Sequence, residues 1–321
     1  MTHDHEHHHS HEHHSHGHGH HGHHGHSHAP ASFGRAFAIG TTLNLGFVIV
    51  ELVYGYVAHS LALFADAGHN LGDVLGLVLA WGATALARRP PTRRYTYGLR
   101  GSSILAALVN AVVLLLSMGA IAWEAIRRFN DPGPVSAGTV IGVAAVGIVI
   151  NTVTALMFMS GRKGDLNIRG AFMHMAADAL VAFGVVLAGI TILVTHWLWL
   201  DPVVSLVLVA VVVVGTWQLL RDSVSLALDA VPAGIEPRSV QTYLAERAGV
   251  SKVHDLHIWA MSTTETALTV HLVMPDGYPG DAFLCSVSKE LQDHFGIKHS
   301  TLQVETGDAE HPCVLEPDHV V

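Results

Sequence analysis

The stretch LALFADAGHNLGDVLGLVLAWGATALA, residues 61–87, has the length of a membrane span and contains three ionisable side chains. A hydrocarbon core of about 30 Å needs roughly 20 consecutive, mostly apolar residues, and this run provides them. Asp66, His69 and Asp73 lie inside it. An aspartate in the middle of a membrane helix costs about 2.5–3.5 kcal/mol even on the most lenient scale, so residues of this kind indicate a functional site. The stretch therefore predicts a membrane helix that carries chemistry.

Five further stretches are apolar and long enough to span a membrane: about 33–58, 102–127, 136–160, 170–195 and 199–225. The composition agrees, because 50% of the 321 residues are hydrophobic and only 13% are charged, against about 25% in a soluble domain. The first stretch follows a long histidine-rich segment and lacks a small-residue cleavage site, so it is not read as a signal peptide. We therefore expect six spans and exclude an ordinary soluble enzyme.

Net charge and cysteine content narrow the class further. A formal charge of −9 leaves no broad basic surface, which excludes nucleic acid as a partner. The two cysteines, Cys285 and Cys313, cannot form a disulfide framework and suit a reducing compartment.

Basic residues in the short loops predict the orientation. They gather in the second and fourth connections: Arg88, Arg89, Arg93, Arg94 and Arg100, then Arg162, Lys163 and Arg169. Only Arg127 and Arg128 run against this trend. Because cytoplasmic loops carry an excess of Lys and Arg, we expect both termini in the cytoplasm. The short loops favour a multi-pass protein of a bacterial inner (plasma) membrane, with an organelle membrane as the alternative.

After residue 226 the pattern changes to a small soluble domain. Helices are expected at 236–247 and 281–295, and strands at 252–260, 263–274 and 299–305. The predicted fold class is a membrane all-α six-helix bundle followed by a small cytoplasmic α+β (αββαβ, ferredoxin-like) domain. Four regions are expected: a disordered His-rich tail at 1–32, the bundle at 33–226, the α+β domain at 227–306, and a flexible tail at 307–321.

Two membrane segments carry the same His-x-x-x-Asp spacing. His69 and Asp73 lie in the second span, and His174 and Asp178 lie in the fifth, within AFMHMAADAL at 171–180. Four residues of α-helix turn by about 400°, so each pair shares one helix face. The two faces together offer two nitrogens and two oxygens, a tetrahedral set that suits Zn²⁺. The alternative is that each pair is a buried hydrogen bond between helices.

Other polar residues at membrane depth have a different interpretation. Asp66 lies near the face of His69 but is expected at a helix interface or entrance, not as a fifth ligand. Glu51 and Asn44 could line the same cavity. The rest are expected to make interhelical hydrogen bonds: Asn110, Glu124 and Asn151.

A second metal site is expected in the soluble domain. His271 lies on one predicted strand, and His299 and Glu305 share a face of another, so the three could form a regulatory zinc site. The alternative is that these side chains are merely solvated. Further candidates are His254, His257, His294, His311 and Cys313, the last two within reach of a dimer partner.

The N-terminal segment is a low-complexity histidine tract. Of the 27 histidines, 16 lie in the first 28 residues. So polar a segment is expected to be disordered. It could collect zinc or copper near the cytoplasmic entrance, or serve only as a solubilising tail.

These features resemble a known family of metal transporters. The strings SLALFADAGHNLGDV at 60–74, LNIRGAFMHMAADAL at 166–180 and VHDLHIWAMS at 253–262, with six spans and an α+β domain, look like the cation diffusion facilitators. The resemblance covers about 33–306. It implies that the paired His and Asp residues form the site of the transported ion, and that the histidine-containing version of this site is associated with zinc. It also implies that metal leaves the cytoplasm in exchange for protons. The soluble domain is implied to dimerise.

The expected function is export of Zn²⁺ in exchange for protons by a homodimer in the lipid bilayer. Cd²⁺, Co²⁺ and Ni²⁺ accept similar ligands and stay open as substrates. Imidazole binds metal only when neutral, and its unperturbed pKa of about 6.5 allows protons to compete. No enzyme activity is expected, because all four ligands hold the ion, and no cofactor is required. Zn²⁺ is expected as substrate and as regulatory ligand. The alternative is a membrane-bound zinc sensor or buffer without transport.

Overall fold

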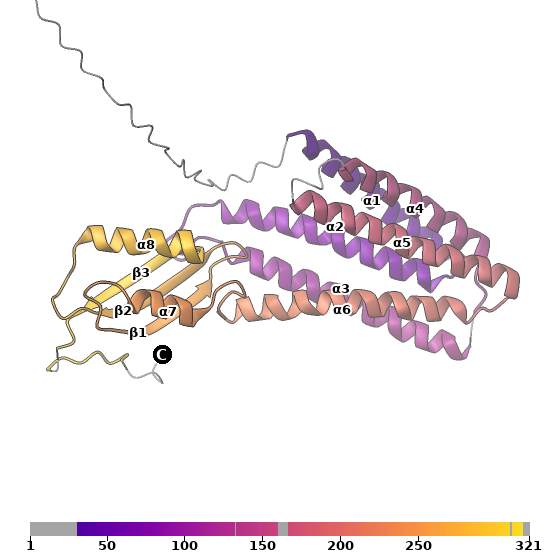
Figure 1. The fold of residues 1–321 in the computed structure, drawn as a ribbon. Coiled ribbons are helices and arrows are strands. Elements are labelled where there is room, and N and C mark those ends of the chain that lie inside the picture. Colours follow the sequence, from indigo (N-terminus) through magenta and orange to yellow (C-terminus); the bar gives the residue numbers. More distant parts are fainter. Residues whose placement is uncertain (1–30, 132, 160–165, 309, 317–321) are drawn as a thin grey trace, which may run out of the picture.

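Six long helices form the membrane part of the molecule (Figure 1). The computed structural model describes residues 31–131, 133–159, 166–308 and 310–316. The helices are α1 Ala31–Ala58, α2 Leu61–Ala87, α3 Ser102–Asn130, α4 Ala137–Met159, α5 Leu166–Thr195 and α6 Leu200–Ala227. Each contains a segment of 20 residues or more that is apolar enough to cross a membrane. The expected six-span bundle is confirmed, and α1 begins at Ala31, inside the region for which we expected a tail.

A line of glycines brings α2 close to α3. Gly68, Gly72 and Gly76 follow one another at four-residue spacing and therefore lie on one helix face. A β-carbon at these positions would meet α3 side chains at 2.7, 2.7 and 2.9 Å, too close for any larger residue without a shift. Small residues of this kind let membrane helices approach closely. Because His69 and Asp73 each follow one of these glycines, they lie about 100° around the helix, away from the glycine contact.

The turn between α1 and α2 is tied to α6 by one buried carboxylate. Asp201, 2% exposed, accepts hydrogen bonds from the hydroxyl of Ser60 at 2.5 Å and from the backbone N–H of Leu61 at 2.7 Å. Ser60 is the N-cap of α2. The first N–H groups of a helix have no partner inside the helix, and a carboxylate there also meets the positive end of the helix dipole. Asp201 therefore fixes the start of the helix that carries His69 and Asp73.

The α+β domain lies at the end of the bundle where α2 ends and α3 begins (Figure 1). Its elements are α7 Pro237–Ala245, β1 Lys252–Ala260, β2 Thr266–Val273, α8 Asp281–Phe295 and β3 Ile297–Glu305. The sheet order is β1-β2-β3, with β1 and β2 antiparallel and β2 and β3 parallel. The expected αββαβ order is confirmed, since each element matches its predicted range within three residues.

The two faces of this sheet have opposite characters. One face carries the core with α7 and α8, which includes the buried residues Val240, Leu244, Ile258, Leu268, Val270, Leu272, Val287 and Leu291. Alternate residues of β2 point the other way, so His271 lies on the opposite face. Arg100, just before α3, forms an ion pair of 2.9 Å with Glu265 at the start of β2. This contact joins the membrane part to one end of the sheet.

Replacing Asp201 with Ala tests the tie between α6 and α2. The change leaves buried donors at Ser60 and Leu61 unpaired, which costs about 1–3 kcal/mol. We expect a lower thermal unfolding midpoint of the full chain in detergent. Asp222→Ala, an exposed change on the same helix, is the control. Equal unfolding midpoints for the two variants would contradict the assigned role.

Candidate metal centres

The four ionisable side chains expected to act together lie together between α2 and α5. His174 Nε2 is 3.2 Å from Asp73 Oδ2 and 3.6 Å from Asp178 Oδ2. His69 Nε2 is 3.5 Å from Asp178 Oδ1 and 3.8 Å from Asp73 Oδ2. Each histidine therefore faces the aspartate of its own helix and the aspartate of the other helix.

These distances suit a tetrahedral metal ion. Zn²⁺ binds nitrogen and oxygen ligands at about 2.0–2.2 Å, so neighbouring ligands of a tetrahedron lie about 3.3–3.6 Å apart. The four nitrogen–oxygen distances run from 3.2 to 3.8 Å. Ligand atoms of His69, His174 and Asp178 all lie within 4.8 Å of one another, and Asp73 adjoins both histidines. Little rearrangement is needed to enclose an ion.

The two carboxylates still have free lone pairs. Asp73 Oδ2 and Asp178 Oδ2 are buried and accept no hydrogen bond from the described residues. A buried carboxylate oxygen without a donor is costly, and a cation offsets that cost. With two ionised carboxylates and two neutral imidazoles, the cluster carries two negative charges, which would neutralise the double positive charge of a divalent ion.

A cavity of about 570 Å³ reaches this cluster from the side of the α+β domain. It is lined by Asp73, His174 and residues of α1 to α5, among them Gly40, Asn44, Leu77, Asn110, Thr154 and Phe158. Along α2 the lining runs from Asp73 toward Leu77, which is the direction of the α+β domain. Asn44 lines the cavity as expected from the sequence. Ions can therefore approach the cluster from this side.

Apolar packing closes the opposite side of the cluster. Phe47, Leu63, Val140, Val143 and Val185 are buried against one another there. Close-packed side chains of this kind leave no room for water or ions. The conformation described by the structure therefore has its larger cavity on the side of the α+β domain. A second cavity of about 270 Å³, lined by Asp66, His69 and Asp73 with residues of α3, α5 and α6, also adjoins the cluster.

The remaining intramembrane polar residues lie outside the cluster. Asn70 Nδ2 donates to Glu51 Oε2 at 3.1 Å, so Glu51 contacts α2 but is not a ligand. Asp66 is buried and lines the second cavity together with His69 and Asp73. Glu124 pairs with Arg128 of its own helix at 3.0 Å, not with another helix as expected.

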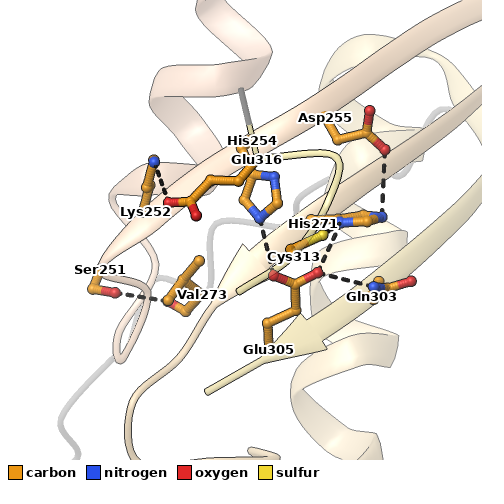
Figure 2. Close-up of polar contacts among 10 residues, drawn as sticks. All are labelled: Ser251, Lys252, His254, Asp255, His271, Val273, Gln303, Glu305, Cys313 and Glu316. Atoms are coloured by element: carbon orange, nitrogen blue, oxygen red, sulfur yellow. Dashed lines mark hydrogen bonds and ion pairs between the residues drawn. The ribbon is translucent and has the colours of Figure 1, made fainter. Parts of the chain in front are cut away.

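A second cluster lies on the polar face of the sheet (Figure 2). His254 Nε2 is 3.0 Å from Glu305 Oε2, and His271 Nδ1 is 2.8 Å from Glu305 Oε1. Cys313 Sγ approaches His271 Nδ1 to 3.6 Å. The potential ligand atoms of these four residues lie within 4.8 Å of one another. Two imidazoles, a carboxylate and a thiol are a ligand set that Zn²⁺ uses in proteins.

Strand register decides which predicted residues meet there. His254 pairs with His271 across β1 and β2, and His271 pairs with Gln303 across β2 and β3. His299 is four residues earlier on β3, about 13 Å along the strand, and its ring lies 5.5 Å from that of Tyr97. The structure thus brings together His271 and Glu305 from the expected set, and places His299 elsewhere.

Cys313 comes from the segment for which we expected a flexible tail. In its described residues this segment lies against the sheet, where Lys252 and Glu316 form an ion pair of 2.7 Å. His254 and Cys313 were expected from the sequence only as further candidates. Because His254 lies opposite His271 once β1 and β2 pair, strand alignment was the signal that could have found it. Nothing in the sequence indicated where Cys313 would fold.

Hydrogen bonding shifts the acid–base properties of this second cluster. Burial raises the pKa of the Glu305 carboxyl, but hydrogen bonds with Cys313, His254 and Gln303 outweigh it and leave the pKa below its usual range. The Leu315 N–H lowers the pKa of the Cys313 thiol, but burial and Glu305 raise it more, so this pKa lies above its usual range. The carboxylate is ready to bind a metal, whereas the thiol must first lose its proton.

Six spans around a cluster of metal-binding side chains in the middle of a bundle define an integral membrane ion transporter. Residues 37–226 match the cation efflux transmembrane domain, and residues 232–307 match the cytoplasmic domain of cation efflux proteins. The chain belongs to the cation efflux family, which consists of transporters and not of enzymes. The α+β domain is accordingly its cytoplasmic domain.

Several bacterial transporters are similar over most of their length. The zinc transporter ZitB of Escherichia coli (strain K12) is 36% identical over 84% of this chain and 86% of its own length. The cadmium, cobalt and zinc/H(+)-K(+) antiporter of Bacillus subtilis (strain 168) is 33% identical over 86% of this chain and 90% of its own. The metal cation efflux system protein CzcD of Cupriavidus metallidurans is 34% identical over 88% of this chain and 89% of its own length.

The pKa of Glu305 predicts a pH dependence of stability without metal. A carboxyl whose pKa is lowered by folding contributes stability above its unfolded pKa of about 4.3, and that contribution is lost as the pH falls through the folded pKa. With a chelator present, wild type should therefore lose more stability than Glu305→Gln as the pH falls below about 4.3. Thermal unfolding measures this, with the exposed change Glu246→Gln as control. Parallel pH profiles for wild type and Glu305→Gln would contradict the prediction.

Proposed function

We propose that this protein exports Zn²⁺ from the cytoplasm across a bacterial inner (plasma) membrane in exchange for protons. The observation that carries the proposal is the meeting of His69, Asp73, His174 and Asp178 at 3.2–3.8 Å in the middle of the bundle. Four such side chains in an apolar environment are costly unless they bind a cation. A zinc sensor or buffer needs no such cluster.

The ligand set favours zinc among the divalent metals. Imidazole and carboxylate in a tetrahedral arrangement suit Zn²⁺, and the two aspartates balance its charge. ZitB of Escherichia coli bears the name of a zinc transporter, and the Bacillus subtilis relative is named for cadmium, cobalt and zinc. We take Zn²⁺ as the main substrate, with Cd²⁺, Co²⁺ and Ni²⁺ as further candidates.

Protons and zinc compete for the same nitrogens. His69 and His174 bind the ion only as neutral imidazoles, so zinc binding expels protons and protonation expels zinc. Exchange with protons follows if the cluster meets the two sides of the membrane in turn. The relative from Bacillus subtilis is named an antiporter of metal against H(+) and K(+).

The cavity and the closed apolar layer give the direction of loading. The cavity reaches the cluster from the side of the cytoplasmic domain, so the described conformation takes zinc from the cytoplasm. Release requires the layer around Phe47 and Leu63 to open and the cavity to close. The cytoplasmic domain is proposed to hold two copies of the chain together as a homodimer.

Zinc flux into proteoliposomes with an imposed pH difference tests the transport function. Wild type should move zinc only when protons can move in the opposite direction. Asp178→Ala leaves one charge of the ion without its counter-charge, and we expect flux to fall by about a hundredfold or more. Asp222→Ala, exposed on α6, is the matched control.

Two outcomes of the same assay would change the conclusion. Saturable zinc binding without flux in wild type would support the sensor or buffer instead. Zinc flux that ignores the proton gradient would exclude the exchange with protons. A variant lacking residues 1–28, which lie outside the described residues, should still transport, because the tail is proposed only to collect metal.

We further propose that His254, His271, Glu305 and Cys313 bind a regulatory Zn²⁺. The four lie within 4.8 Å on one face of the sheet. His254 and His271 are 4% and 8% exposed, so their orientation is fixed by the surrounding structure before metal arrives. Such preorganisation favours binding. Cys313 would tie the C-terminal segment to the sheet when zinc is bound.

Cys313→Ser tests this regulatory site. In a full chain that also carries Asp178→Ala, zinc binding should weaken by about tenfold or more when the thiol is removed, as expected for loss of a direct ligand. Isothermal titration measures the affinity. Because the thiol must lose a proton, affinity with Cys313 present should rise with pH.

The second cysteine of the chain provides the control. Cys285 is exposed on α8, and Cys285→Ser should bind zinc like the parent. Unchanged affinity in Cys313→Ser would remove Cys313 from the site, and loss of affinity in both variants would indicate a general effect of thiol removal.

A further inference from the structure

The connection between α2 and α3 carries a positive charge that the neighbouring sequence does not balance. It reads RRPPTRRYTYGLR at 88–100 and contains five arginines, whereas no aspartate or glutamate occurs from residue 74 to residue 123. Arg100 is paired with Glu265 of the cytoplasmic domain. The other four arginines of the connection are exposed: Arg88, Arg89, Arg93 and Arg94.

Contacts with other parts of the chain do not balance this charge either. Among the described residues, the arginines in ion pairs with carboxylates are Arg100, Arg127, Arg128 and Arg247. None of the four exposed arginines of the connection belongs to this set. Arg94 lies near Tyr95, with its guanidinium carbon 5.9 Å from the ring centre. Four guanidinium groups are thus available to an anion from outside the chain.

The length of α2 places these arginines at the level of the lipid headgroups. The helix rises by about 1.5 Å per residue, so Arg88 lies about 40 Å from Leu61 at the opposite end. A bilayer is about 40–45 Å thick with its headgroups, and its hydrocarbon core is about 30 Å thick. Trp81 is 76% exposed and lies about 30 Å from Leu61, at the boundary where tryptophans gather in membrane proteins. Arg88 and the residues after it therefore reach the cytoplasmic headgroup layer.

Hydrogen bonds hold the connection in a defined shape. The N–H of Thr92 donates to the carbonyl of Tyr95 at 3.0 Å, and the N–H of Tyr95 donates to the hydroxyl of Thr92 at 3.1 Å. Arg93 and Arg94 lie at the bend between these two residues. Further along, the ring of Tyr97 lies 5.5 Å from that of His299 in the cytoplasmic domain. A segment that is ordered in advance loses less conformational entropy when it binds a ligand.

The side chains of the connection suit a phosphate in this layer. The planar guanidinium group presents paired donors that match two phosphate oxygens. Clusters of Lys and Arg next to a membrane span are attracted to the anionic lipids of the cytoplasmic leaflet. Tyr95, 50% exposed, adds an amphipathic ring of the kind found at membrane interfaces. The amine of a zwitterionic headgroup, by contrast, would be repelled by the arginines.

We propose that Arg88, Arg89, Arg93 and Arg94 bind the phosphate of an anionic phospholipid in the cytoplasmic leaflet. The bound lipid holds the cytoplasmic ends of α2 and α3 at the membrane surface. Because the same connection carries Arg100, which pairs with Glu265, the lipid also steadies the contact between the bundle and the cytoplasmic domain. This lipid site is separate from both proposed zinc sites.

Native mass spectrometry of the full-length protein in non-ionic detergent tests the lipid site. The probes are phosphatidylglycerol and phosphatidylcholine with identical acyl chains. Wild type should bind phosphatidylglycerol about tenfold more tightly or better. Arg93→Gln combined with Arg94→Gln should lower this preference by about fivefold or more, and replacing all four arginines with Gln should abolish it. Because the lipid is added to protein in detergent, the result does not depend on how a variant is oriented in a membrane.

The matched control removes the same charge from the cytoplasmic domain. Arg238→Gln combined with Lys289→Gln changes two exposed positions on α7 and α8 and should keep the preference of wild type. An equal loss in this control would show a general effect of net charge and overturn the assignment. Equal binding of the two lipids by wild type, or an unchanged preference without the four arginines, would exclude the site.

An excess of inorganic phosphate separates a lipid headgroup from a free anion. Phosphatidylglycerol should stay bound in its presence, because the lipid is also held by its position in the detergent layer. Displacement of the lipid by phosphate would show that the arginines bind a free anion instead.

The unmodified protein gives a second test if the variants do not fold. In vesicles, quenching of tryptophan fluorescence by brominated lipids measures the preference for the anionic lipid. Salt screens ionic attraction, so the preference should fall as the ionic strength is raised from about 0.1 M to about 1 M. A preference that does not change with salt would contradict binding through the arginines.

Discussion

The structure depends on the cost of placing two carboxylates and two imidazoles inside a bundle of apolar helices. A divalent cation would offset that cost, and the proposed transport site rests on this balance. The glycine line of α2 allows α3 to approach closely, while the neighbouring face presents His69 and Asp73 to α5. Asp201 fixes the start of the same helix. The packing against α3 and the proposed ion site thus lie on adjacent faces of one helix.

The two proposed metal sites lie in different environments. In the membrane, the four side chains are held between helices and adjoin a cavity. In the cytoplasmic domain, strands and a returning C-terminal segment surround the four side chains. Arg100 and Glu265 join the membrane part to the end of the sheet where β1 ends and β2 begins, whereas His254 and Glu305 lie at the other end. The length of the strands therefore separates this contact with the bundle from the second cluster.

The intramembrane cluster could be predicted from the sequence because the same His-x-x-x-Asp spacing occurs in two apolar membrane spans. An i, i+4 pair must share a helix face, and membrane burial removes most alternatives to ion binding, so His69, Asp73, His174 and Asp178 could be predicted to act together. The cluster on the sheet was predicted less completely. The alternation of side chains along a strand shows which face a residue occupies, but it does not show which residue of the next strand lies beside it. His299 shares a face with Glu305 yet lies too far along β3 to join His271.

The sequence by itself determined the six spans, the αββαβ domain and the matching His-x-x-x-Asp faces of the second and fifth spans, because hydrophobic length, periodicity and helix geometry act over a few residues. Only the tertiary structure decided that Cys313 returns to His271, that Asp201 caps a helix 140 residues away, and that Asn70 of α2 donates to Glu51 of α1. Each of these contacts joins segments whose separation in space depends on how whole helices and strands pack. No local pattern encodes that packing, since it is the sum of many weak contacts along the full length of each element.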